Sequence, residues 1–172
     1  MKYKLLSLLI ISFLFLLTLV FFLGLKKERI YDNTHIKHIE LEEFKISRLN
    51  EKGHVTKKNL SESNFTIVNF WASWCAPCRV EHKFLMSLKK FPDLRMIGIN
   101  YKDREVNALN FLQELGNPYD IIGEDKTGKL SVNFGIYGVP ETLLFNEELK
   151  ILKKFIGPLD ENSIKEIKKI IK

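Results

Sequence analysis

The two cysteines of this chain are the residues best suited to carry chemistry. Cys75 and Cys78 lie in the segment Trp74-Cys75-Ala76-Pro77-Cys78-Arg79 and are the only cysteines among 172 residues. Two intervening residues in the first turn of a helix let the sulfur atoms reach bonding distance. A C-x-x-C pair that follows a buried strand and opens a helix is typical of redox sites. The spacing therefore predicts a pair that cycles between dithiol and disulfide.

The expected position of Cys75 at a helix N-terminus distinguishes the two sulfurs. The positive end of the helix dipole and the free N–H groups there stabilise a thiolate and lower the pKa of the thiol. Pro77 fits the first helical turn, where its missing N–H costs nothing. We therefore assign Cys75 as the attacking thiolate and Cys78 as the resolving thiol.

Three other interpretations of the pair fit the sequence less well. Covalent haem attachment requires C-x-x-C-H, and Arg79 stands at the histidine position. A metal site of Cys75, Cys78 and His82 has no obvious fourth ligand. A purely structural disulfide that closes so small a loop would add little stability. Redox catalysis is the interpretation that we prefer.

Composition narrows the class of protein. The net charge is 27 − 21 = +6, and residues 1–29 hold five cations and one anion, so the other 143 residues carry 22 − 20 = +2. This near balance, without a basic stripe interleaved with aromatic residues, argues against nucleic acid as a partner. Hydrophobic residues make up 45% of the chain, too many for a disordered protein.

The N-terminal region predicts a membrane anchor. Residues 5–25 are apolar apart from two serines, a threonine and a glycine, and a helix of that length spans about 31 Å, close to the hydrocarbon thickness of a bilayer. A cleaved secretory signal is the alternative, but its apolar region is usually only about 7–15 residues long. We expect a cytoplasmic tail at 1–4 and a linker at 26–43, in which His35 and His38 are expected to be solvated. Flanking charges leave the orientation open.

Alternating strand and helix patterns follow the linker. A half-buried strand is expected at 44–49 and a loop at 53–64. Further strands are expected at 65–71, 94–99, 142–145 and 151–156, and helices at 77–90, 104–115 and 160–172. On the 77–90 helix we expect Val80, Phe84, Leu85 and Leu88 to share the buried face. This order predicts an α/β fold with a mixed sheet.

Several strings of the chain resemble one family. The segment 68–78, ending in Trp74-Cys75-Ala76-Pro77-Cys78, looks like the active-site strand and turn of the thioredoxin superfamily. Four further strings make the chain similar to the narrower DsbE/CcmG family of thiol:disulfide interchange proteins of cytochrome c maturation. They are Cys78-Arg79-Val80-Glu81-His82, Gly98-Ile99-Asn100-Tyr101-Lys102-Asp103, Leu115-Gly116-Asn117-Pro118-Tyr119 and Gly135-Ile136-Tyr137-Gly138-Val139-Pro140-Glu141-Thr142.

The resemblance implies a fold and several supporting residues. The fold would be thioredoxin-like, with a central mixed sheet flanked by helices over residues 44–172. Pro140 would be a cis proline facing the disulfide, and Trp74 would pack beside Cys75. Glu81 and Glu141 would be acidic residues near the site that buffer a thiol or move its proton. Neither a cofactor nor a metal is implied.

Two departures from the family pattern affect the chemistry. Asn69 stands where general thioredoxins usually have a buried aspartate, and an amide cannot accept the thiol proton. The proton acceptor is then expected to be Glu81 or Glu141. The inner dipeptide Ala76-Pro77 differs from the Pro-Thr of some members, and this dipeptide tunes the redox potential.

The resemblance also implies partners and a location. We expect a reductant of apocytochrome c, or of a haem-ligation assembly protein, on the periplasmic face of a bacterial inner membrane. A membrane thiol reductase of the DsbD/CcdA type would re-reduce it. The alternatives are a general envelope reductase with broader substrates, an oxidant, and a non-catalytic module that holds unfolded apocytochrome.

Overall fold

The structure is a computed structural model that describes residues 2–25 and 41–172. Residues 26–40 of the expected linker, which include His35 and His38, lie outside the described residues. The chain divides into two compact units between residues 32 and 33. Each unit is described by itself.

The N-terminal unit is one long apolar helix, α1 (Lys2–Leu25). Its 24 residues correspond to about 36 Å at 1.5 Å per residue, enough to cross a bilayer. The stretch Leu6–Gly24 is long and apolar enough to span a membrane, and none of it is buried in the structure. This agrees with the apolar segment expected at 5–25.

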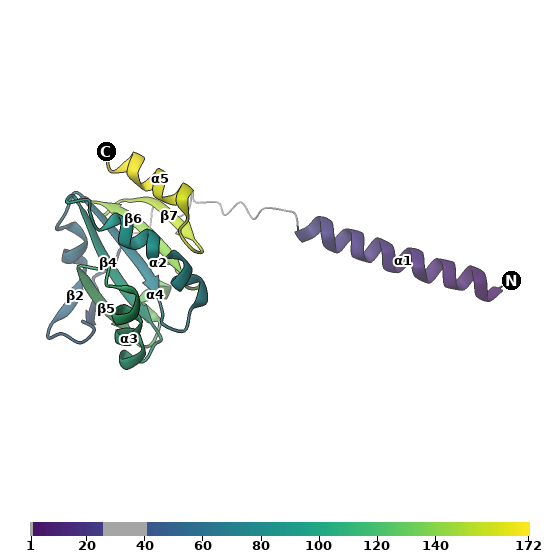
Figure 1. Ribbon diagram of the computed structural model, residues 1–172, viewed down its shortest axis with the longest axis horizontal. Coiled ribbons are helices and arrows are strands. Elements are labelled where there is room, and N and C mark those ends of the chain that lie inside the picture. The colour runs from purple at the N-terminus through teal and green to yellow at the C-terminus, as the bar shows by residue number, and fades with distance from the viewer. Residues whose placement is uncertain (1, 26–40) are drawn as a thin grey trace. The chain divides into compact units, whose positions relative to one another are not determined.

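A five-stranded mixed sheet forms the centre of the second unit (Figure 1). Its strand order is β5-β4-β3-β6-β7, with β3, β4 and β5 parallel and with β6 and β7 antiparallel to their neighbours. The bounds are β3 (Phe65–Trp71), β4 (Leu94–Tyr101), β5 (Ile121–Asp125), β6 (Glu141–Asn146) and β7 (Ile151–Ile156). The mixed sheet expected from the sequence is thus confirmed.

Central strand β3 carries buried apolar residues on both faces because both are covered. Ile67 and Trp71 belong to a hydrophobic core with residues of three helices, whereas Val68 and Phe70 belong to a second core on the other face. A strand covered on both sides appears in the sequence as a continuous apolar run. The helices of the first core are α2 (Ala76–Leu88), α3 (Glu105–Leu115) and α5 (Glu161–Ile170), and α4 (Lys129–Asn133) belongs to the second.

The buried face of α2 includes three of the four residues that we expected, since Phe84 also packs half-buried against the first core. Leu85 and Leu88 are buried as predicted, but the Val80 side chain is 61% exposed. The face that meets the core is completed by Cys78, Glu81 and His82, which are also buried. The prediction followed apolar residues, and it failed at Val80 because the N-terminal half of this face carries polar groups that have hydrogen-bond partners inside the protein.

Four short elements were missed. β2 (His54–Thr56) and the 3-10 helix η2 (Lys57–Ser61) lie within the expected loop 53–64, and β2 pairs with a β1 (Lys45–Ser47) that is shorter than expected. The sequence shows no apolar pattern at β5, which ends Gly-Glu-Asp, or at α4, which has only the five residues Lys-Leu-Ser-Val-Asn. Asp125 at the end of β5 is buried and accepts hydrogen bonds from the backbone N–H and hydroxyl of Ser131, 2.8 and 2.7 Å long.

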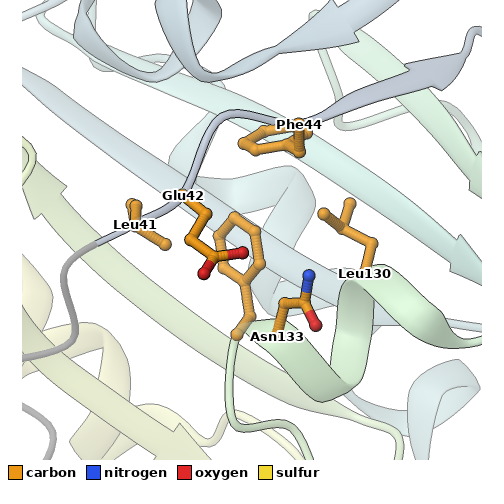
Figure 2. A pocket seen from close by; sticks show the side chains of 6 residues that line it. Leu41, Glu42, Phe44, Leu130 and Asn133 are labelled. Atoms are coloured by element: carbon orange, nitrogen blue, oxygen red, sulfur yellow. The ribbon is translucent and has the colours of Figure 1, made fainter.

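The folded domain begins before residue 44. Leu41, which we placed in the linker, is buried in the second core. It also lines a pocket on the α4 side of the sheet (Figure 2). The lining residues are Leu41, Glu42, Phe44, Leu130, Asn133 and Phe134. This pocket contains none of the residues expected to carry the chemistry.

Candidate active site

The two cysteines are joined in a disulfide at the N-terminus of α2. The Sγ atoms of Cys75 and Cys78 are 2.05 Å apart. Cys75 is the N-cap of α2, and its Sγ accepts a hydrogen bond of 3.1 Å from the backbone N–H of Cys78. In the reduced protein the same N–H and the helix dipole favour a thiolate at Cys75 over one at Cys78.

The loop before Cys75 is held by one carboxylate. Asp103 accepts hydrogen bonds from the backbone N–H of Ser73 (2.6 Å) and from its hydroxyl (2.8 Å). The same carboxylate accepts from the Asn100 amide and from the backbone N–H of Arg104. The end of β3 is therefore fastened to the end of β4, which fixes where α2 begins.

Trp74 lies on the surface beside the disulfide. Its side chain is 59% exposed, and its Nε1 donates to the Lys102 carbonyl at 3.2 Å. The ring lies against Tyr101, with 6.5 Å between the centroids. Trp74 is thus available to an incoming chain and does not fill the core.

Glu81 is fully buried behind the disulfide, one helical turn after Cys78. One carboxylate oxygen accepts from the Asn69 amide and the other from the backbone N–H of Leu159, both at 2.9 Å. Burial raises the pKa of the Glu81 carboxyl to about 7, against the lowering effect of these two hydrogen bonds. Glu81 therefore exchanges a proton near neutral pH.

His82 uses its ring on other groups of the protein. Its Nε2 lies 2.9 Å from the carbonyl oxygen of Gly116, with which it forms a hydrogen bond. Its ring packs edge-on against Phe111. Burial lowers the pKa of His82. The interpretation of His82 as a third ligand beside the two cysteines is not supported by this geometry.

The loop before β6 reaches the same edge of the sheet as the disulfide. Glu141 pairs with Phe70 near the end of β3, so the residues just before Glu141 lie where β3 leads toward Cys75. The Val139–Pro140 peptide bond is cis, as the resemblance implied. Tyr137 in this loop is 88% exposed.

Known proteins share this sequence pattern and this fold. The Redoxin family matches residues 40–171. The thiol:disulfide interchange protein CycY of Rhizobium leguminosarum is 49% identical over 105 residues, which are 61% of this chain and 56% of the relative. The protein HelX of Rhodobacter capsulatus, of the same description, is 40% identical over 120 residues, 70% of this chain and 68% of the relative. The thiol:disulfide interchange protein DsbE of Vibrio cholerae is 35% identical over 124 residues, 72% of this chain and 67% of the relative. The chain belongs to the DsbE family of thiol:disulfide interchange proteins.

The fold is shared with a solved structure. A structure described as a thiol:disulfide interchange protein DsbE from Chlorobium tepidum superposes with a TM-score of 0.61. It is 21% identical, and the match covers 76% of this chain and 92% of the other. The thioredoxin-like fold expected from the sequence is thereby confirmed. This DsbE-family chain spans 56% and 68% of the lengths of CycY and HelX.

Glu141 has a different environment from Glu81. One of its oxygens accepts from the backbone N–H groups of Tyr137 and Gly138, at 2.9 and 3.0 Å. The other lies 2.7 Å from Nζ of Lys154, a buried lysine of β7 that also donates to the Gly135 carbonyl. The ion pair of Glu141 and Lys154 therefore fixes the loop that ends in Pro140 through hydrogen bonds to its backbone.

The two glutamates lie on opposite faces of the sheet. Glu81 bonds Asn69, which shares a face of β3 with Ile67 and Trp71. Glu141 follows the alternation of Leu143 on β6 and therefore belongs to the other face. Both carboxyl groups are buried, so neither glutamate is a solvated surface charge.

Sequence reasoning missed three residues that shape the site: Tyr119, Lys154 and Asp103. Lys154 looked like one of many surface lysines, because it directly follows Lys153 in β7 and no alternation of polar and apolar residues marks it as buried. Tyr119 was quoted only as part of a family string. Its hydroxyl donates a 2.7 Å hydrogen bond to the Asn69 carbonyl oxygen.

Replacement of Lys154 by methionine is expected to destabilise the protein by about 3–5 kcal/mol, because it leaves the Glu141 carboxylate buried without its countercharge. Lys153→Met is the matched control on the same strand. Lys153 pairs with Glu166 at 2.7 Å, but the two side chains are 32% and 44% exposed, and such pairs contribute only about 0–1 kcal/mol. Urea unfolding of the full chain in detergent measures both. Equal losses in the two variants would contradict the role given to Lys154, as would failure of Glu141→Gln to recover stability in the Lys154→Met protein.

Proposed function

We propose that this chain is a membrane-anchored thiol:disulfide oxidoreductase that reduces a disulfide in apocytochrome c, or in a haem-ligation assembly protein, during biogenesis of c-type cytochromes. The observation that carries the proposal is the Cys75–Cys78 pair at the N-terminus of α2. Membership of the DsbE family supports the reaction class. The cytochrome substrate rests on the family resemblance.

The reaction is a two-step exchange in which the protein supplies both electrons. The Cys75 thiolate of the reduced protein attacks one sulfur of the substrate disulfide, so a mixed disulfide forms and the other substrate sulfur leaves as a thiolate. Cys78, once deprotonated, attacks the Cys75 sulfur and releases the second substrate thiolate. The substrate ends as a dithiol and the protein as the Cys75–Cys78 disulfide.

Glu81 is the group that we assign to the proton of Cys78. Both residues lie on the buried face of α2, one turn apart. A carboxyl group whose pKa is about 7 can accept a proton from a resolving thiol and return it to solvent or substrate near neutral pH. Glu141 is less suited, because Lys154 and two backbone N–H groups occupy its oxygens on the other face of the sheet.

The proposed location follows from the chemistry that the substrate needs. Apocytochrome cysteines are exposed to oxidation outside the cytoplasm, so the reductase domain belongs in the periplasm, with α1 as an uncleaved anchor in the inner membrane. A membrane thiol reductase of the DsbD/CcdA type then has to reduce the Cys75–Cys78 disulfide again. A reporter fused after Lys172 should be active in the periplasm, and activity only in the cytoplasm would contradict this topology.

A trapping experiment tests the substrate. Cys78→Ala removes the resolving thiol, so mixed disulfides on Cys75 accumulate and can be identified by mass spectrometry after isolation from native membranes. The matched control is the double variant Cys75→Ala/Cys78→Ala, which has no attacking thiol and should capture nothing.

The captured proteins decide between the substrate classes. Apocytochrome c or a haem-ligation protein, absent from the control, is the expected result. Many unrelated envelope proteins would replace the proposal with a general envelope reductase. Capture of a membrane thiol reductase alone would support the step in which the Cys75–Cys78 disulfide is reduced again. It would contradict the proposal that a cytochrome or its assembly protein is the substrate.

A further inference from the structure

A buried chain of polar side chains lies behind the active-site helix. The Tyr119 hydroxyl donates to Oδ1 of Asn69 at 2.7 Å. Nδ2 of Asn69 donates to the Thr142 hydroxyl and to Oε1 of Glu81, both at 2.9 Å. Asn69, Glu81 and Thr142 are fully buried and Tyr119 is 4% exposed. The hydrogen bonds among these four side chains are therefore made in an environment of low dielectric, where an unpaired polar atom is costly.

The Tyr119 ring is fixed independently of its hydroxyl. It stacks on Trp71, with 5.7 Å between centroids and 20° between planes. A Cβ atom at Gly98 would come within 2.8 Å of the Tyr119 ring and 2.9 Å of Trp71 Nε1, so this glycine of β4 provides the space for the ring. The hydroxyl consequently reaches Asn69 at a set position.

The Asn69 amide can meet Glu81 in two ways with opposite effects. When Nδ2 faces Glu81, an N–H donor stabilises the carboxylate. When the amide is rotated by 180°, Oδ1 faces Glu81, repels the carboxylate and accepts from the carboxylic acid. The Tyr119 hydroxyl has its hydrogen to donate, so it pairs best with Oδ1 and selects the first orientation.

Tyr119 keeps its proton under all relevant conditions. Burial raises the pKa of Tyr119 well above its usual value, and the nearby Glu81 carboxylate raises it further. Its hydroxyl is therefore a permanent donor to Asn69. We propose that Tyr119 is a positioning residue that acts through Asn69: it holds the amide with Nδ2 toward Glu81 and so favours the carboxylate form of Glu81 over the acid. The part of this inference that concerns thiol exchange rests on the proposed function.

The other groups around Glu81 do not supply this bias. From the segment before α5 the backbone N–H of Leu159 donates to Oε2, and the neighbouring Asp160 is exposed to solvent. On α2 itself, Cys78 shares the buried face, and His82 is bonded to the Gly116 carbonyl. Within residues 41–172, no lysine, arginine or histidine makes an ion pair with Glu81. The orientation of the Asn69 amide is therefore the feature that can change the balance between the carboxylate and the acid form of Glu81.

Tyr119→Phe in the oxidised full chain, held in detergent micelles, tests the proposal. The phenyl ring keeps the stacking on Trp71 but no longer selects an amide orientation. The loss of one buried hydrogen bond should raise the pKa of Glu81 by about one unit, a tenfold gain in proton affinity. The readout is the pH titration of glutamate side-chain carboxyl carbons by NMR, with Glu81 assigned by its absence in Glu81→Gln.

Two further variants keep the test specific. Tyr101→Phe makes the same atomic change at the end of β4, where the structure records no hydrogen bond to the Tyr101 hydroxyl, and should leave the Glu81 titration unchanged. In the reduced protein, Tyr119→Phe should shift the pH profile of thiol exchange upward, and this shift should vanish in the Glu81→Gln background. A fall or no change in the pKa of Glu81 in a folded Tyr119→Phe protein would overturn the inference. The titration uses the oxidised protein, so its result does not depend on whether the exchange reaction itself is confirmed.

Discussion

Replacement of Cys75 by serine is expected to abolish disulfide reduction by the full chain and to bring the rate to that of buffer alone. A serine hydroxyl is not ionised at neutral pH, so nothing at this position can attack a disulfide sulfur. The Cys78 thiol does not replace it, because it is 2% exposed and lies a turn inside α2. The measurement is the reduction of a peptide disulfide by the pre-reduced, detergent-solubilised protein.

Cys78→Ser is the matched control, because it removes the other sulfur in the same way. It should still attack the peptide and yield one mixed disulfide per protein molecule, without the second step. The assignment of the two roles is contradicted if Cys78→Ser is inert and Cys75→Ser forms the mixed disulfide instead.

The second large effect concerns stability against pH. Glu81→Gln should gain stability relative to the unmodified protein as the pH rises, by about 3 kcal/mol between pH 4 and pH 8. Below about pH 4.5 Glu81 is protonated in both the folded and the unfolded states. Between this pH and about 7 only the unfolded state loses the proton, so the folded state binds more protons and its stability falls. Glutamine cannot ionise and is spared this loss.

Urea unfolding of the oxidised full chain at a series of pH values measures this difference. In the oxidised state neither cysteine titrates, so the two proteins differ in one ionisable group. A constant offset between them is expected as well, because glutamine cannot accept from both Asn69 and Leu159. Glu114→Gln, at a glutamate whose side chain is 60% exposed, is the matched control for the loss of one carboxyl group. A difference that is the same at pH 4 and pH 8 would contradict the burial and the raised pKa of Glu81.

The sequence predicted an element well where a local signal, such as an apolar run or a capping residue, marks its bounds. The run Phe65–Trp71 is apolar apart from Thr66 and Asn69, and the structure has β3 at those bounds. Helix α5 begins one residue after Asp160, the N-cap whose side chain accepts from Ser163. Capping residues and apolar runs act within a few residues of each other, so they are visible in a single sequence.

Elements whose stability comes from distant contacts were not visible. β5 has only five residues, and Gly123 in it lies under Ile46 of β1. Val80 was placed in the core because it is apolar, yet α2 turns Glu81 and His82 inward instead. The partners that make this possible, Asn69 and Leu159 for Glu81 and Gly116 for His82, are 12 to 78 residues away in the chain.

The same difference between local signals and distant contacts holds for the residues of the active site. The cysteine pair was recognised from its spacing and from its place between a buried strand and a helix, because this geometry is local. The choice between Glu81 and Glu141 depended on which face of the sheet each occupies and on Lys154, 13 residues further along on another strand. No pattern within one segment carries that information.

The measurement that tests the central claim most directly is the reduction potential of the Cys75–Cys78 pair. The full chain is equilibrated with dithiol buffers of known potential, and the free thiols are then alkylated and counted by mass spectrometry. A reductant of substrate disulfides should have a potential near or below about −270 mV, the range of thioredoxin. A potential near about −120 mV, the range of a strong oxidant such as DsbA, would contradict the reductive role.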